Sequence, residues 1–91
     1  MNIDLVNLGE KLTADLHSAA KKFDPRSDDC DILEYEALAV EIRLREIDGL
    51  TEKDTDRRES SLLSDWGAHT RAKIPELTDR VREFYRLYEC K

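Results

Sequence analysis

The sequence predicts an all-α protein, a small helical bundle formed by one domain of residues 1–91. Two observations support this class. Apolar residues recur at helical spacing in several stretches, and only three glycines and two prolines interrupt the chain, too few turn residues for a β sandwich. The expected helices span about 2–23, 31–48, 52–73 and 75–89. Pro75 either begins the fourth helix or kinks one long third helix, which would leave three.

The first expected helix, 2–23, has one apolar stripe along its length. Gly9 lies on that stripe, where the missing side chain would let another helix approach closely. Asn2 or Asp4 can cap the start, and Asp24-Pro25 ends the helix because the residue before a proline is disfavoured in the α region. The stripe consists of Leu5, Leu8, Leu12, Leu16, Ala19, Ala20 and Phe23.

The second expected helix, 31–48, has two apolar faces separated by a small polar stripe of Glu36 and Arg43. A surface helix needs one apolar face, so the second predicts either a central position or a homodimer contact. A strand is the alternative, since residues 40–45 alternate, but Glu46 breaks that alternation. One face holds Leu33, Ala37, Val40, Leu44 and Ile47; the other holds Tyr35, Leu38, Ala39 and Ile42.

The third and fourth expected helices carry the remaining apolar positions. Thr51 begins an imperfect capping box, and the apolar face of 52–73 consists of Leu62, Leu63, Trp66, Thr70 and Ile74. In 75–89 the inward positions are Leu77, Val81, Phe84, Tyr85 and Tyr88. We expect Trp66 and the aromatic residues of 75–89 to be core, with Tyr85 and Leu87 as the exceptions that could face a partner.

Composition argues against several functions. The formal net charge is −6 and the pI is near 4.9, which disfavours binding to phosphate backbones or anionic membranes. Cys30 and Cys90 match neither a zinc spacing nor a disulfide framework. The sequence shows neither a signal peptide nor an apolar run longer than Ala37–Val40, so we expect a cytoplasmic protein with reduced thiols.

Motifs for catalysis are not found. The two histidines lie in no metal-ligand pattern, the three glycines form no phosphate-binding loop, and the acidic stretch 24–35 departs from an EF-hand loop at several required positions. We therefore predict no catalytic, cofactor-binding or metal-binding residues, no cofactor and no enzymatic activity.

An acidic segment at the entrance of the second helix is the strongest functional signal. Six acids are opposed only by Arg26, and capping by Asp28, Asp29 or Asp31 would explain only one or two of them. We expect the segment to bind a basic protein surface; a solvated capping loop is the alternative. The predicted partner-binding residues are Asp24, Asp28, Asp29, Asp31, Glu34 and Glu36.

The expected function is therefore that of a non-enzymatic acidic protein that binds another protein as an inhibitor or adaptor. In size, acidity and lack of motifs, the chain is similar in type, not in sequence, to phage-encoded inhibitors of host defence or nucleic-acid-handling proteins. The alternative is a helix-turn-helix-like nucleic-acid-binding regulator that uses residues 52–61. Residues 52–59 carry a net charge of −1, which opposes phosphate binding.

Overall fold

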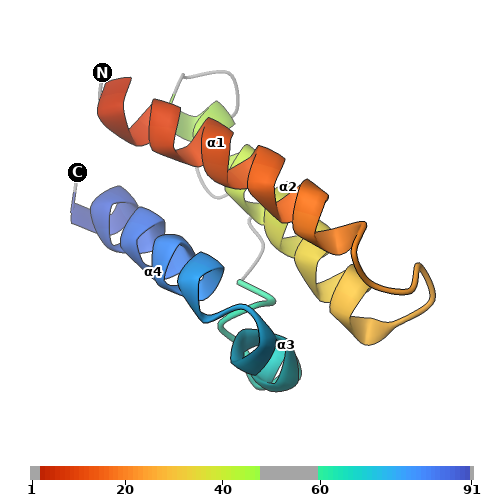
Figure 1. Cartoon of the computed structure of the whole chain (residues 1–91). Helices are drawn as coiled ribbons and strands as arrows, with labels where there is room; N and C mark the ends of the chain where they lie inside the picture. Colours follow the sequence, from red (N-terminus) through yellow and green to blue (C-terminus); the bar gives the residue numbers. More distant parts are fainter. Residues whose placement is uncertain (1–2, 48–59, 91) are drawn as a thin grey trace.

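The computed structural model describes residues 3–47 and 60–90, and these form an all-α bundle. In chain order the elements are α1 (Ile3–Ala20), α2 (Asp28–Ile47), the 3-10 helix η1 (Asp65–Gly67), α3 (Ala68–Lys73) and α4 (Pro75–Cys90). Helices α1 and α2 form an antiparallel hairpin, α4 lies along it, and the short α3 crosses at one end (Figure 1). Within these ranges, none of the helices has the length and apolar character needed to cross a membrane.

The α1–α2 connection differs from prediction at both ends. Helix α1 ends at Ala20, and the chain reaches Phe23 through a turn rather than a further helical turn. Helix α2 begins at Asp28, three residues earlier than expected, because Ser27 caps it: the Ser27 Oγ accepts the Cys30 N–H at 3.2 Å. The predicted aspartate cap was therefore wrong. A serine one residue before the first helical position satisfies that N–H group.

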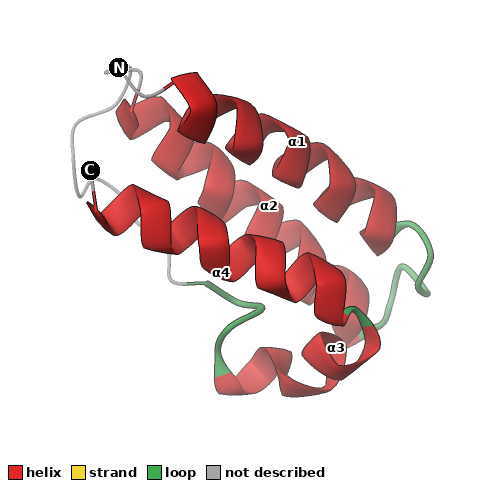
Figure 2. Cartoon of the chain, turned by 60° about the vertical axis from the view of Figure 1, so that its left-hand side comes forward, coloured by secondary structure: helices red, strands yellow, loops and turns green. Residues whose placement is uncertain are grey.

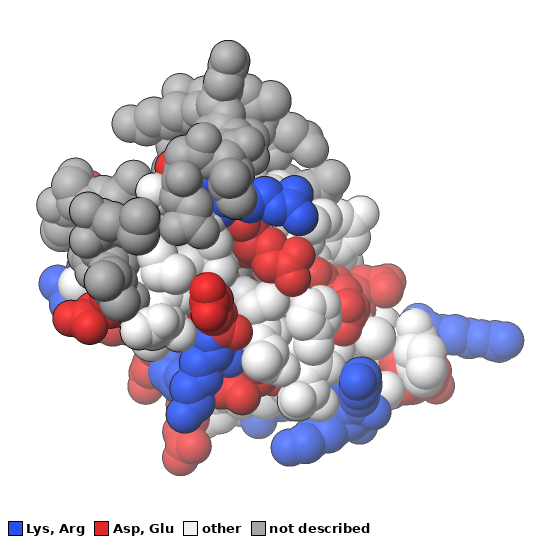
Figure 3. Space-filling view, turned by 90° about the horizontal axis from the view of Figure 1, so that it is seen from above, with Lys and Arg blue, Asp and Glu red and all other residues white. Residues whose placement is uncertain are grey.

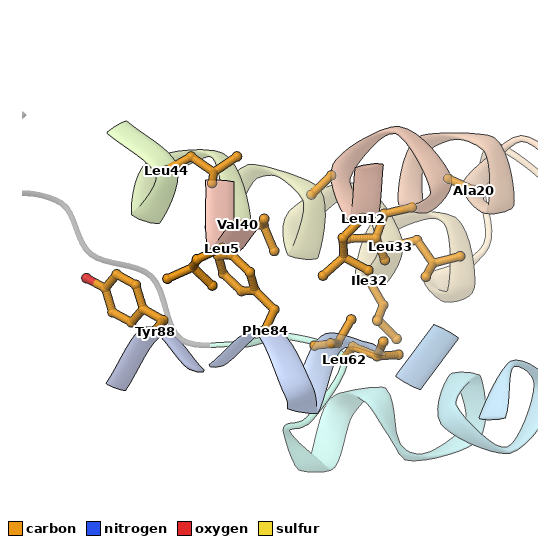
Figure 4. Packing of buried hydrophobic residues seen from close by; sticks show 13 residues of the cluster. Leu5, Leu12, Ala20, Ile32, Leu33, Val40, Leu44, Leu62, Phe84 and Tyr88 are labelled. Carbon is orange, nitrogen blue, oxygen red and sulfur yellow. The ribbon is translucent and has the colours of Figure 1, made fainter. Parts of the chain in front are cut away.

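The core lies between α1, α2 and α4, with Leu62 added from the segment before η1 (Figure 4). The predicted stripe of α1 is confirmed, since Leu5, Leu12, Leu16 and Ala20 are buried. The other buried apolar residues of this cluster are Ile32, Leu33, Ala37, Val40, Leu44, Leu62, Val81, Phe84 and Tyr88.

Gly9 sets the distance between helices, as the sequence predicted. A Cβ atom at this position would lie 2.6 Å from Leu44 Cδ2 and 2.7 Å from Phe84 Cε1. Side chains of both α2 and α4 therefore fill the space beside one turn of α1. This contact helps α4 to pack directly on α1.

The predicted third helix, 52–73, is confirmed only in its last part, as η1 and α3. Residues 52–59 lie outside the described residues, 60–64 form a turn, and α-helix begins only at Ala68. Serine hydroxyls replace helical hydrogen bonds here: Ser60 Oγ accepts the Leu63 N–H, and Ser64 Oγ donates to the Ser61 carbonyl. Ile74 leaves the helical region (φ −135°), so α3 and α4 are separate helices rather than one kinked helix.

Gly67 allows this turn to fold back on itself. A Cβ atom there would lie 2.4 Å from the carbonyl oxygens of both Ser61 and Leu62, so backbone would have to move. We expect Gly67→Ala to lower the free energy of unfolding by about 1–3 kcal/mol, the usual cost of overpacking. Urea denaturation followed by circular dichroism measures this. Ala68→Gly, at an exposed neighbour, is the control and should cost about 0.5–1 kcal/mol; an equal or smaller loss for Gly67→Ala would contradict the close approach.

The second apolar face of α2 is mostly buried within the single chain. Ala39 and Ile42 are buried, Leu38 is half-buried, and only Tyr35 is exposed. The observation that suggested a homodimer is therefore largely accounted for by the fold itself.

A polar seam separates α2 from α4, formed by Glu36, Arg43, Glu46, Tyr85 and Tyr88. The Tyr85 hydroxyl donates to Glu36 Oε2 at 2.6 Å, and the Tyr88 hydroxyl donates to Glu46. The Arg43 guanidinium carbon lies 4.5 Å from the centre of the Tyr85 ring. Tyr85, an inward position that we also named as a possible exception, points into the bundle, where the Glu36 carboxyl accepts its hydroxyl.

Candidate functional site

The six acids predicted to bind a partner do not form one surface. Glu36 is fully buried, and it accepts hydrogen bonds from Ser60 and Tyr85. Burial raises the pKa of its carboxyl, while the Ser60 and Tyr85 hydroxyls and nearby Arg43 oppose the rise. Glu36 is a structural residue of the bundle interior and cannot contact a partner, so its inclusion in a binding surface was wrong.

Asp29 holds α3 against the start of α2. Its two carboxylate oxygens accept hydrogen bonds from Thr70 Oγ1 and Lys73 Nζ, each at 2.5 Å. The hydrogen bond from Lys73, followed by that from Thr70, lowers the pKa of the Asp29 carboxyl. This aspartate therefore connects two elements that are far apart in the sequence, and most of its side chain is covered.

Asp24 and Glu34 are exposed but have partners within the chain. Asp24 Oδ1 accepts the Arg26 N–H at 2.9 Å, which closes the turn before α2. The Glu34 carboxylate lies 3.1 Å from His17 Nδ1, and Glu41 lies 3.5 Å from His17 Nε2. His17 therefore connects α1 to two positions of α2 that lie about two turns apart.

Asp28 and Asp31 are the acids of this segment that remain open. Both are exposed, and neither side chain makes a hydrogen bond or ion pair within residues 3–47 and 60–90. At about 100° per residue they lie on the same side of α2 as Tyr35, which follows Asp31 by four residues. Two carboxylates and an exposed aromatic ring thus share one face of the helix.

Trp66 completes this surface from a different part of the chain. Its ring meets the Tyr35 ring edge-on, with centroids 5.8 Å apart, and the two residues are 46% and 48% exposed. Asp65, its exposed neighbour in η1, adds a third carboxylate. We refer to Asp28, Asp31, Tyr35, Asp65 and Trp66 as the aromatic–acidic surface.

The sequence misplaced Trp66 in the core because the helical spacing used to predict it does not hold in the turn at 60–64. In the structure Leu62 is buried, while Trp66, four residues later, faces outward. A local signal was present: serines at 60, 61 and 64, followed by a glycine at 67, are typical of a turn rather than a helix.

The segment that carries Trp66 is held to α2 at three levels. Asp29 binds α3, the Ile32 carbonyl accepts the Ser61 hydroxyl at 2.6 Å, and Glu36 accepts the Ser60 hydroxyl. Asp29, Ile32 and Glu36 lie on one side of α2, about one turn apart. These contacts place η1 beside α2, where Trp66 meets Tyr35.

Arg71 of α3 stabilises the turn at 60–64 by hydrogen bonds to its backbone. Its Nη1 donates to the Leu62 carbonyl at 2.8 Å and to the Ser64 carbonyl at 2.6 Å. A charged donor shared by two carbonyls is a strong constraint on a short irregular segment. The position of Trp66 is therefore fixed by contacts on both sides of the turn.

The alternative hypothesis, a nucleic-acid-binding regulator that uses residues 52–61, gains no support from the described residues. Its residues 52–59 lie outside them, and Ser60 and Ser61 direct their hydroxyls toward α2. On the face shown in Figure 3, basic and acidic side chains are interspersed among uncharged ones. Among residues 3–47 and 60–90, no three histidine, cysteine or acidic side chains are grouped as a metal site would require.

A shallow groove of about 480 Å³ lies where α1 ends beside the α3–α4 junction. It is lined by both charges, including Asp15, Lys22, Lys73 and Glu76. Lys73 is already paired with Asp29, and Asp15 with Arg80 at 2.6 Å.

Cys30, in the first turn of α2, is half-buried. Burial, followed by the negative charges of Glu34 and Asp31, raises the pKa of its thiol and so disfavours the reactive thiolate.

Comparisons of the chain with protein-family models, curated proteins and solved structures find no match.

Proposed function

We propose that this chain is a non-enzymatic protein that binds another protein through the aromatic–acidic surface, as an inhibitor or adaptor. The observation that supports this most directly is that Trp66 and Tyr35 are exposed together with their rings in contact. Large aromatic residues are the side chains most enriched at the energetic centres of protein interfaces. Singly exposed apolar residues are common, whereas two touching aromatic rings form a larger contact area.

The carboxylates around the rings support a partner with a basic surface. Asp28 and Asp31 share a helix face with Tyr35, Asp65 precedes Trp66 in the chain, and the chain as a whole has a net charge of −6. Rim charges of one sign speed and orient the encounter with a surface of the opposite sign. The proposed interface thus has an aromatic centre and an acidic rim, which is the usual arrangement of interface residues.

The test is affinity capture from an extract of the native host, followed by mass spectrometry. We expect Trp66→Ala to weaken capture of the partner by about 30-fold, equivalent to about 2 kcal/mol for a central interface aromatic. Asp28→Lys with Asp31→Lys should also weaken capture, and more so at low salt. Asp29 is left unchanged because it holds α3.

The matched control is Asp4→Lys with Glu10→Lys, which makes the same charge change at two exposed positions of α1. Capture that is equal for the native chain and all three variants would refute the proposed surface. Light scattering of the native chain and the Trp66→Ala variant adds a second readout. A dimer that Trp66→Ala dissociates would show that the surface binds a second copy rather than a different protein.

A further inference from the structure

The aromatic–acidic surface is suited to one kind of side chain more than any other. An indole ring attracts a cation over its face more strongly than tyrosine or phenylalanine does. Trp66 is nearly half exposed, and the edge-on contact with Tyr35 holds its ring in place. An arriving cation would therefore meet a preorganised ring.

Three exposed carboxylates of this surface are candidates to pair with a cation bound at Trp66. Asp65 adjoins Trp66 in η1, and Asp31 precedes Tyr35 by one helical turn, with Asp28 one turn further. These three side chains make no hydrogen bond or ion pair within the described ranges, so their acceptor oxygens face solvent. The chain shows that it can stack a guanidinium on an aromatic ring, because Arg43 lies 4.5 Å from the centre of Tyr85.

We propose that the occupant of this surface is an arginine of a basic segment in a partner protein, with its guanidinium stacked on Trp66 and paired with Asp31 or Asp65. This inference rests on the proposed function and names the chemistry of the partner. Arginine is favoured over lysine because its planar group stacks on a ring while its N–H groups pair with a carboxylate in the same plane. Lysine can supply only a point charge.

Trp66 is the only tryptophan in the chain, so its fluorescence reports directly on this surface. The probes are two glycine–serine peptides of equal length, one with three arginines and one with three lysines. We expect the arginine peptide to change the Trp66 emission with one-to-one saturation and to bind about two- to fivefold more tightly than the lysine peptide.

Variants distinguish a specific surface from general attraction to an acidic protein. Asp31→Asn with Asp65→Asn should weaken binding of the arginine peptide, whereas Asp4→Asn with Glu10→Gln, which removes the same charge from α1, should change it little. Trp66→Leu, followed by calorimetry, should remove the preference for arginine over lysine while circular dichroism confirms the fold.

Equal binding of the two peptides, or equal loss for the two pairs of charge variants, would overturn the assignment and leave only net-charge attraction. The capture experiment tests the proposed function separately from this arginine assignment. If the arginine peptide shows no preference but Trp66→Ala still abolishes capture of a host protein, the surface binds a protein by other contacts. If neither occurs, both proposals fail.

Discussion

Phe84→Ala is expected to lower the free energy of unfolding by about 3–5 kcal/mol, the range for removing a buried phenylalanine. Phe84 is fully buried, and its ring lies where a side chain on Gly9 would otherwise be. It also contacts the rings of Tyr85 and Tyr88, with centroids 5.6 and 6.3 Å away. A domain of this size has a total stability of about 5–14 kcal/mol, so this loss takes a large share.

Urea denaturation followed by circular dichroism measures the effect, and two matched variants interpret it. Phe84→Leu keeps an apolar side chain of intermediate volume and should lose less than Phe84→Ala. Leu87→Ala, on the same helix but only half-buried, should also lose less because part of the removed surface is already in contact with water. A loss below about 1 kcal/mol for Phe84→Ala would show that α4 does not pack on Gly9 as described.

Glu36→Ala is the second change with a large expected effect. It leaves the Tyr85 and Ser60 hydroxyls without their acceptor, and each buried group left unpaired costs about 1–3 kcal/mol. Glu36→Gln keeps the shape and an acceptor oxygen, so it should retain most of that stability near pH 4. Comparing the two separates the hydrogen bonds of Glu36 from its charge.

The charge of Glu36 should appear as a dependence of stability on pH. Its folded-state pKa is raised above the ordinary value of 4.5 by burial, so the folded chain holds this proton more tightly than the unfolded chain. The contribution to stability is complete below the unfolded pKa and is lost as pH rises through the folded pKa. The Glu36→Gln variant has no such loss, so it should gain stability relative to the native chain as pH rises from about 4 to 8.

The pKa values of two other carboxyls are shifted in the opposite direction to that of Glu36. Asp29 and Glu83 have lowered pKa values, from hydrogen bonds with Lys73 and Arg86 respectively, so their contributions are lost as pH falls. Both residues are present in the native chain and in Glu36→Gln, so their effects cancel in the difference. Urea denaturation at a series of pH values gives that difference. A constant difference across this range would contradict the raised pKa.

The sequence alone determined the helical class and most of the core. The α1 stripe, the inward positions of α4 and the role of Gly9 follow from spacing, because in a continuous α-helix residues three or four apart share a face. Pro75 was compatible with either a helix start or a kink, and the backbone at Ile74 decided for a helix start. For the apolar positions of α1 and α4, local pattern and tertiary packing agreed.

The tertiary structure decided which acids are available and where Trp66 lies. Glu36 and Asp28 look alike in the sequence, but one accepts a hydroxyl from α4 and the other faces solvent. The Tyr85 hydroxyl that Glu36 accepts comes from 49 residues further along the chain. The Thr70 hydroxyl that Asp29 accepts comes from 41 residues further along. Composition and periodicity carry no information about such distant pairs.

The acidic segment therefore changes from one predicted surface to several separate roles. Asp24 closes a turn, Asp29 holds α3, Glu34 pairs with His17, and Glu36 lies in the bundle interior. Asp28 and Asp31 remain exposed. Figure 2 shows the α1–α2 hairpin with α3 and α4 packed beside it. The turn at 60–64 then brings Trp66 to Tyr35 because serine hydroxyls, Arg71 and Gly67 stabilise it in place of a helix. Only the folded chain joins these two segments into one surface.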